Sequence, residues 1–507
     1  MNKEQALAVL KDKDKQIVKL NHILAILEWD QDTVMPLYAS EERGEQSALL
    51  SSLVHKMSTS SEIQESLDVL DGCDFESDID NALVRYWEKE LGRSLCLPNK
   101  FVEDFSKAKN SAHDSWLRAR AEGDFSIYEK DLDKILSFAK EKMSLFSKVG
   151  SNSSRDLYDV ALDVFEEGLD TKTVDLLFDD LEKTIHCLMD KLQDIEVDDS
   201  FLFSKYDENK LHSFCLSVID RMGFDHNRGI VGITAHPYTT TLGVDDHRIS
   251  TRYSDDGLFD PIGSIVHETG HALYEMCASK EEPIRGTSLG TGVSMGIHES
   301  QSRFWENIMA RSKAFWSYQY PYLQENIDSL KEIPLDLFVR AINKSKPSAI
   351  RVNADELTYN LHIILRYRIE KELFNGTLGV HDLPERWNEL SQDIIRYKVK
   401  NDKEGVLQDV HWSMGEFGYF PTYAIGNIYS ASFYSSMCKD LGGKGAVDSL
   451  LSSGDYSRIT EWQSDNIWKC GATYSPSVLL DRVTHSKVDA EPFKEYLVTK
   501  FSDLYLN

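Results

Sequence analysis

The stretch from residue 260 to 276, DPIGSIVHETGHALYEM, contains His267, Glu268 and His271 in an order and spacing that suit metal-dependent hydrolysis. Residues four apart lie on one face of a helix, so the two imidazoles could bind one metal ion at about 2.0–2.1 Å. Glu268 stands beside them, where a carboxylate could take a proton from the attacking water and pass it to a leaving amine. The pattern predicts a zinc hydrolase with Glu268 as general base and acid.

This assignment depends on a helix and on a third ligand. Asp260 suits the cap of a helix, Pro261 suits its first position, and apolar residues recur at helical intervals up to Leu273. Three fixed positions can also match by chance, with the histidines hydrogen-bonded in a core. A catalytic zinc usually has three protein ligands, so a further donor must come from elsewhere in the chain.

Glu299 is the candidate for this third ligand. It follows His271 by 28 residues, within GVSMGIHESQSRFWENIM at 292–309. That interval is long enough for one helix to end and a second helix to return beside it. Its neighbour His298 is the alternative ligand, but two histidines and one glutamate form a known catalytic zinc set. We therefore expect His267, His271 and Glu299 to hold the metal.

Composition limits the class of protein. The chain has 507 residues, enough for two or three average domains, although a large helical enzyme can also form one body. Its formal net charge of −28 disfavours nucleic acid and anionic membranes as partners. The seven cysteines are scattered and never form CxxC, which indicates a reducing, cytoplasmic location. No stretch has the length and apolarity of a membrane span or a signal peptide.

The chain changes character along its length. Residues 1–226 read as mostly helical, with loops near 58–80 and 195–210, and residues 254–507 read as helical and contain the metal site. Residues 227–253 are β-branched and punctuated by glycine, which predicts a small antiparallel sheet with a turn near 243–246. We predict one mainly α catalytic domain over 1–507, with a deep central groove lined by this sheet.

Four further short stretches concentrate polar residues between helices. They are HPY at 236–238, DHRIS at 246–250, IRVNAD at 350–355 and GVLQDVHW at 405–412. Together with HETGH and HESQ, they resemble the characteristic motifs of the carboxypeptidase Taq family, which are HPF, DXRXT, HEXXH, HES or HESQ, IRXXAD and GXXQDXHW in that order. The resemblance covers the whole chain. Two departures keep the chemical group concerned, because Tyr238 retains an aromatic ring and Ser250 retains a hydroxyl.

The resemblance implies a function and an assembly. It implies that His267, His271 and Glu299 hold zinc, with cobalt as a possible substitute, and that Glu268 is the general base and acid. It also implies a helix-rich, gluzincin-type fold with a long groove, a homodimer, and removal of single residues from the C-termini of peptides.

A carboxypeptidase must bind a terminal carboxylate, and arginine is the side chain best shaped to do so with two hydrogen bonds. Arg351 and Arg248 are the candidates. The developing oxyanion needs a donor besides the metal, and Tyr423, His236 or His411 could supply it. These five residues form the predicted substrate-binding set.

Three polar residues, Asp355, Gln408 and Asp409, are expected to orient the ligands or the arginines. An endopeptidase or oligopeptidase of the same metal class is the nearest alternative, because HEXXH and a distal glutamate do not fix where a chain is cut. A catalytically silent binding protein with this fold is a second alternative, which the intact Glu268 disfavours.

Overall fold

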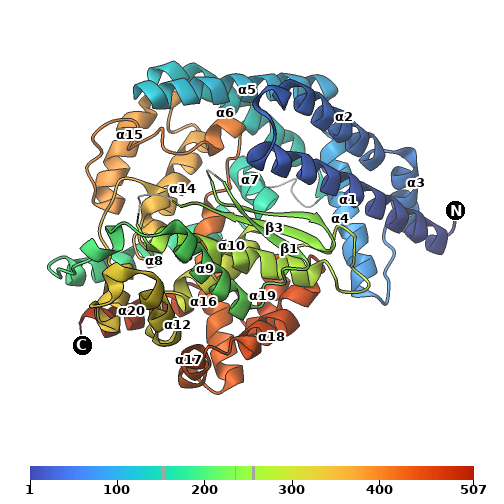
Figure 1. The fold of residues 1–507 in the computed structure, drawn as a ribbon. Coiled ribbons are helices and arrows are strands. Elements are labelled where there is room, and N and C mark those ends of the chain that lie inside the picture. The colour runs from blue at the N-terminus through green and yellow to red at the C-terminus, as the bar shows by residue number, and fades with distance from the viewer. Residues whose placement is uncertain (151–154, 235, 254–256, 507) are drawn as a thin grey trace. The chain divides into compact units, whose positions relative to one another are not determined.

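The computed structural model describes residues 1–150, 155–234, 236–253 and 257–506, and helices dominate them (Figure 1). The chain divides into two compact units. The first unit consists of Met1–Ser94, Val197–Ile342 and Tyr429–Val488, and the second of Leu95–Glu196, Asn343–Ile428 and Asp489–Asn507. Among the described residues, no helix is both long enough and apolar enough to cross a membrane.

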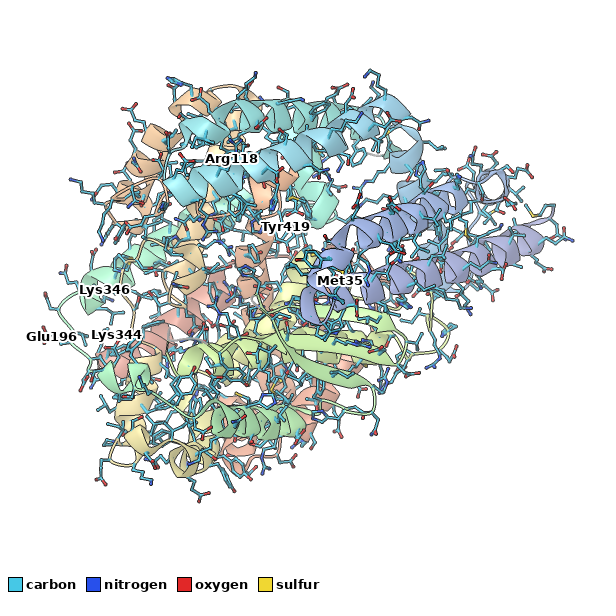
Figure 2. All side chains as sticks on the ribbon, turned by 45° about the horizontal axis from the view of Figure 1, so that its top comes forward. Met35, Arg118, Glu196, Lys344, Lys346 and Tyr419 are labelled. Carbon is cyan, nitrogen blue, oxygen red and sulfur yellow. The ribbon has the colours of Figure 1, made fainter. Side chains whose placement is uncertain are left out.

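The first unit contains most of the helices. They are α1 (Lys3–Thr33), α2 (Ser40–Ser58), α3 (Ser61–Leu70), α4 (Asp78–Leu95), α9 (Glu208–Met222), α10 (Phe259–Ala278), α11 (Met295–Arg303), α12 (Lys313–Asn326), α13 (Leu335–Ile342), α17 (Lys444–Ser453), α18 (Ser457–Asn466) and α19 (Pro476–Thr484). Met35 lies at the turn between α1 and α2 (Figure 2). The expected loop near 58–80 is partly wrong, because α3 forms there and buries Ile63 and Leu70.

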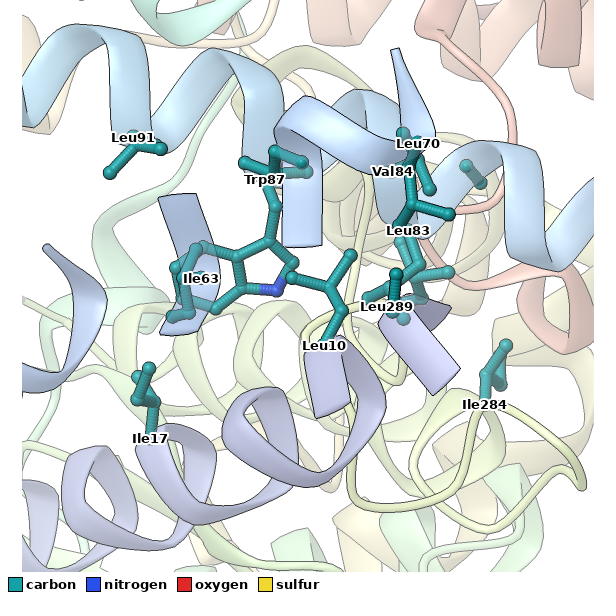
Figure 3. Packing of buried hydrophobic residues seen from close by; sticks show 13 residues of the cluster. Leu10, Ile17, Ile63, Leu70, Leu83, Val84, Trp87, Leu91, Ile284 and Leu289 are labelled. Atoms are coloured by element: carbon teal, nitrogen blue, oxygen red, sulfur yellow. The ribbon is translucent and has the colours of Figure 1, made fainter. Parts of the chain in front are cut away.

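These N-terminal helices share an apolar cluster with a loop that follows α10 (Figure 3). Leu10 of α1, Ile63 of α3 and Trp87 of α4 pack there with Leu289. The Trp87 indole donates a 2.9 Å hydrogen bond to the buried carboxylate of Asp14. Burial of apolar side chains, supplemented by this satisfied polar contact, therefore fixes α1 and α4 against the loop that leads into α11.

The sheet of the first unit has three strands, β1 (Gly229–Ile233), β2 (Thr239–Gly243) and β3 (Asp246–Thr251), in the order β1-β3-β2. The small sheet and its turn at 243–246 are confirmed, but the pairing is mixed. β2 and β3 form the expected antiparallel hairpin, whereas β1 pairs with β3 in parallel. The difference arises because β1 does not pair with β2, the next strand in sequence. Instead β3, the last strand in sequence, lies between them and runs parallel to β1.

In its described part the second unit has helices and no strands. Its helices are α5 (Asn99–Glu122), α6 (Ser126–Phe146), α7 (Leu157–Phe165), α8 (Thr171–Leu192), α14 (Tyr359–Asn375), α15 (Leu383–Leu390) and α20 (Glu491–Tyr505), and α16 (Pro421–Leu441) begins in this unit and ends in the first. Figure 2 shows α5 and α6 with their side chains, with Arg118 labelled on α5. Trp116 of α5 donates to the Leu407 carbonyl at 3.2 Å, so α5 supports the segment that contains GVLQDVHW.

The mainly helical fold and the helical N-terminal part are confirmed. The single domain over 1–507 and the deep groove stay predictions.

Candidate metal centre and candidate substrate-binding residues

Helix α10 positions the two histidines and Glu268. The helix begins at Phe259, so Asp260 and Pro261 lie in its first turn and do not cap it. The rings of His267 and His271 have centroids 4.9 Å apart. The four-residue spacing therefore places both imidazoles on one face, as expected.

Helix α11 approaches α10 closely enough to add a third donor. A side-chain carbon at Gly270 would lie 2.6 Å from the Gln301 carbonyl oxygen and 2.7 Å from the Ser302 Cα, so only glycine permits this approach. As a result, Oε2 of Glu299 lies 3.7 Å from Nε2 of His267 and 3.5 Å from Nε2 of His271.

This donor group fits a metal ion. The three ligand atoms lie within 4.8 Å of one another. Two ligands at about 2.0–2.2 Å from a tetrahedral metal are about 3.3–3.6 Å apart, close to the separations from Glu299. Two imidazole nitrogens and one carboxylate oxygen are also the donors that zinc accepts in catalytic sites.

The other ring nitrogen of His267 is held by a carboxylate. Nδ1 lies 2.8 Å from Oε2 of Glu306, which belongs to the π-helical segment Phe304–Met309 that continues α11. A carboxylate accepts, so Nδ1 is protonated and Nε2 offers its lone pair to a metal.

His271 is oriented through His298. The Nδ1 atoms of the two rings are 2.6 Å apart, and Nε2 of His298 lies 2.9 Å from Oε1 of Glu275. Glu275 also accepts from the Thr291 hydroxyl at 2.8 Å. Because the carboxylate of Glu275 can only accept, Nε2 of His298 is the donor in that hydrogen bond. Nδ1 of His298 is then unprotonated and accepts from Nδ1 of His271. Both nitrogens of the alternative ligand His298 are thus engaged, and among the described residues Glu299 completes the donor group.

The electrostatics favour metal binding at two of these residues. Burial alone would raise the pKa of Glu299, but the Arg303 guanidinium and His267 hold it well below its ordinary value. Burial, together with the neighbouring imidazoles, lowers the pKa of His271 to about 3. A charged carboxylate and a neutral imidazole are the forms that bind metals.

Glu268 is 7% exposed and borders this group. Its Oε2 accepts a 2.6 Å hydrogen bond from the Thr239 hydroxyl on β2, which fixes one carboxylate oxygen and leaves the other available. Burial raises the pKa of Glu268 above its ordinary value. A more basic carboxylate in a fixed position suits a general base.

Two of the predicted substrate-binding residues, Arg248 and His236, lie in the first unit. Arg248 binds Asp246 through Nε at 3.0 Å and Nη2 at 2.9 Å and lies 5.6 Å from the Trp29 ring. His236 is exposed. The Ser250 hydroxyl, from the DHRIS stretch, accepts from the Tyr238 amide at 3.0 Å, so the serine holds the HPY turn in place.

Arg351 in the second unit is buried in an ionic cluster. Its Nε and Nη2 donate to Oδ1 of Asp409 at 3.0 and 2.8 Å, and its Nη1 donates to the Tyr359 hydroxyl at 3.1 Å. Oδ2 of Asp409 accepts from Arg366 Nε at 2.7 Å. Gln408 accepts from the Arg351 amide at 2.9 Å and from Arg366 Nη2 at 2.8 Å. The expectation that Gln408 and Asp409 orient an arginine is confirmed.

Two more predicted residues join Arg351 in this unit. Nε2 of His411 lies 3.3 Å from the Tyr423 hydroxyl, and the Arg351 guanidinium lies 5.1 Å from the Tyr423 ring. The expectation for Asp355 is wrong, because its carboxylate accepts from the hydroxyl and amide of Thr358 at the start of α14. Asp355 is therefore a helix-end residue that orients neither an arginine nor a ligand.

Some residues of these sites escaped the sequence reading. Glu275 and Arg303 each follow a predicted ligand by four residues, so helical spacing could have indicated them. Glu306 and Arg366 carried no such signal. Glu306 depends on a π-helical turn, and Arg366 is one of several charged residues of α14 with nothing in its spacing to mark it.

The sequence profile of the carboxypeptidase Taq (M32) metallopeptidases matches residues 9–501. The chain belongs to this family. Carboxypeptidase 1 of Bacillus subtilis is 36% identical and covers 97% of both chains. Thermostable carboxypeptidase 1 of Thermus thermophilus is 35% identical over 100% of both.

Solved M32 structures agree in fold. The M32 carboxypeptidase from Deinococcus radiodurans superposes with a TM-score of 0.94 at 32% identity, over 99% of this chain and 100% of that one. The Pyrococcus furiosus carboxypeptidase superposes with a TM-score of 0.93 at 33% identity, over 98% of each chain. As an M32 member, the protein is a metal-dependent carboxypeptidase that acts on peptides.

Proposed function

We propose that the protein removes single amino acids from peptides with a free C-terminus, with zinc held by Nε2 of His267, Nε2 of His271 and Oε2 of Glu299. The observation that carries this proposal is the convergence of these three atoms beside Glu268. When bound there, zinc would polarise the scissile carbonyl and make a water molecule more acidic. Cobalt is a possible substitute.

Glu268 is the proposed proton carrier. One of its oxygens is fixed by Thr239, and the other takes a proton from the attacking water. The same carboxyl then gives that proton to the leaving amine nitrogen. Its raised pKa supports this role, because the protonated form must persist long enough to act as an acid.

Arg351 is the proposed anchor for the terminal carboxylate. It shares Asp409 with Arg366, so two guanidinium charges face one carboxylate and one positive charge remains to be balanced. The Nη1 atom of Arg351 donates to a neutral phenol, Tyr359, which is a weaker acceptor than a carboxylate. A peptide C-terminus supplies the missing charge and the stronger acceptor.

Tyr423, His411 and His236 remain the proposed oxyanion donors. Tyr423 and His411 have the better support, since they lie in contact with each other and Tyr423 flanks Arg351.

The alternative is an endopeptidase or oligopeptidase with the same metal centre. One observation supports this alternative. Arg248 makes two hydrogen bonds to the carboxylate of Asp246, so it is less suited to bind a substrate carboxylate. In that case Arg248 limits the space beside Trp29 and does not anchor a chain end.

Two variants test these roles. Glu268→Gln should keep zinc, measured by elemental analysis, and lose several orders of magnitude in kcat, because only the proton carrier is removed. Arg351→Ala should reduce kcat/KM for free peptides far more than for the same peptides amidated at the C-terminus. Near-normal turnover of Glu268→Gln contradicts the mechanism, and equal losses on both peptide forms favour the alternative.

A homodimer and a cytoplasmic location complete the proposal. Among the described residues, no disulfide joins any of the seven cysteines, which supports a reducing compartment. Light scattering of the purified protein tests the dimer.

A further inference from the structure

The two oxygens of Glu299 have different environments. Oε2 faces Nε2 of His267 and Nε2 of His271, at 3.7 and 3.5 Å. Oε1 instead accepts a 2.6 Å hydrogen bond from Nε of Arg303, one helical turn further along α11. The carboxylate therefore presents one oxygen to the histidines and the other to a guanidinium.

Arg303 is itself held in place. Its Nη1 donates to Oε2 of Glu306 at 3.0 Å, and the same oxygen accepts from Nδ1 of His267. The side chain of Arg303 is 13% exposed and that of Glu299 is 7% exposed, so solvent screens their interaction little. The guanidinium is fixed between the third donor residue and the carboxylate that orients the first.

We propose that Arg303 is a positioning residue that restricts Glu299 to a single ligand atom. This inference rests on the proposed metal site. For Glu299 to bind through both oxygens, its carboxylate would have to turn Oε1 toward the metal and out of its alignment with Arg303, which would weaken a short, charge-assisted hydrogen bond in a buried site.

The consequence concerns the coordination positions that the protein leaves open. Two imidazole nitrogens and one carboxylate oxygen make three protein ligands, and a catalytic zinc site needs at least one further position for water or substrate. A second oxygen from Glu299 would occupy space that the substrate carbonyl requires. Arg303 thus keeps a coordination position open for catalysis, at the expense of metal affinity.

The test compares zinc-loaded crystal structures and zinc affinities of wild-type protein and variants. Arg303→Met reaches about as far as Nε of the arginine but has no N–H donor, and Arg303→Leu is shorter and also has none. In both we expect Glu299 to bind zinc through two oxygens, with zinc affinity equal to or above that of the wild type. We expect kcat to fall about tenfold to a hundredfold, the usual range for such partners, with KM little changed.

Two further variants separate this effect of Arg303 on Glu299 from general damage to the protein. Arg303→Lys keeps one charged donor within reach of Glu299 and should restore one-oxygen binding and most of the kcat. Glu306→Gln leaves the bond from Arg303 to Glu299 intact, so it should lower zinc affinity while Glu299 still binds through one oxygen. The visible absorption of the cobalt-loaded proteins should report the same division, because its intensity falls as the coordination number rises.

The outcomes distinguish this inference from the proposed function. One-oxygen binding of Glu299 in Arg303→Met and Arg303→Leu overturns the inference, as does two-oxygen binding in the wild type. Zinc bound elsewhere in the wild type, or not bound, instead overturns the proposed metal site. If Arg303→Met does not fold, Arg303→Leu decides the question with the same readouts.

Discussion

Replacing Asp409 with asparagine should destabilise the second unit strongly. Asp409 is the shared acceptor of two buried guanidinium groups, and the side chains of Arg351 and Arg366 are only 8% and 0% exposed. These arginines hold the pKa of Asp409 well below its ordinary value, against the effect of burial. The carboxylate is therefore charged at all ordinary pH values.

Asparagine has almost the same shape but one acceptor oxygen and no charge. If its oxygen accepts from Arg366, its amide group faces the donors of Arg351, so one guanidinium loses its partner. Removing one member of a buried ion pair costs about 3–5 kcal/mol, because an uncompensated charge is left behind. We expect a loss of this size in the free energy of unfolding.

Urea unfolding followed by tryptophan fluorescence measures this loss. The matched control is Asp448→Asn, because Asp448 pairs with Lys444 at 2.6 Å on an exposed helix, where 61% of the lysine side chain is accessible. Such pairs contribute about 0.3–0.5 kcal/mol. If Asp409→Asn costs less than about 1 kcal/mol and matches the control, the ionic cluster does not have the energetic role argued from its burial.

Three other changes have defined outcomes. Gly270→Ala should push α11 away from α10 and lower zinc affinity measured against a competing chelator, because its Cβ would lie 2.6 Å from the Gln301 carbonyl; unchanged affinity would mean that the helices can adjust. His298→Ala should lower zinc affinity about tenfold to a hundredfold by removing the partner of His271, whereas the exposed His226→Ala should not. Burial raises the pKa of Glu370 from 4.5 to about 7, so the folded state binds an extra proton between these values. The free energy of unfolding should therefore fall by roughly 3 kcal/mol as pH rises through that window. Glu370→Gln should remove this part of the pH dependence in urea titrations, and an identical slope in both proteins would contradict the assignment.

The metal centre could be predicted because its signals are local. Two histidines four residues apart need only a helix to converge, and the periodicity of α10 indicated one. Glu299 required one assumption more, that a second helix returns beside the first. Gly270, inside the same motif, is what makes that return possible.

The parts that sequence reading missed depend on tertiary contacts. Strand order cannot be read from alternation alone, so the parallel pairing of β1 with β3 was not foreseen. Asp409 is one of three residues that the sequence predicts to orient the ligands or the arginines, and it pairs with Arg351, but Arg366 shares that carboxylate from 43 residues away. Asp355 lies in the same IRVNAD stretch as Arg351 and nevertheless accepts from the amides of Leu357 and Thr358 just before α14, because a short aspartate side chain can bond its own neighbouring backbone.

Mass spectrometry of a mixed peptide digest tests the central claim most directly. The same peptides, with free and with amidated C-termini, are incubated with the protein in the presence and absence of a chelator. We predict stepwise loss of C-terminal residues from the free peptides only, abolished by the chelator. Internal cleavage regardless of amidation would contradict the proposed carboxypeptidase activity and favour the endopeptidase alternative, and no cleavage with zinc present would point to a binding protein.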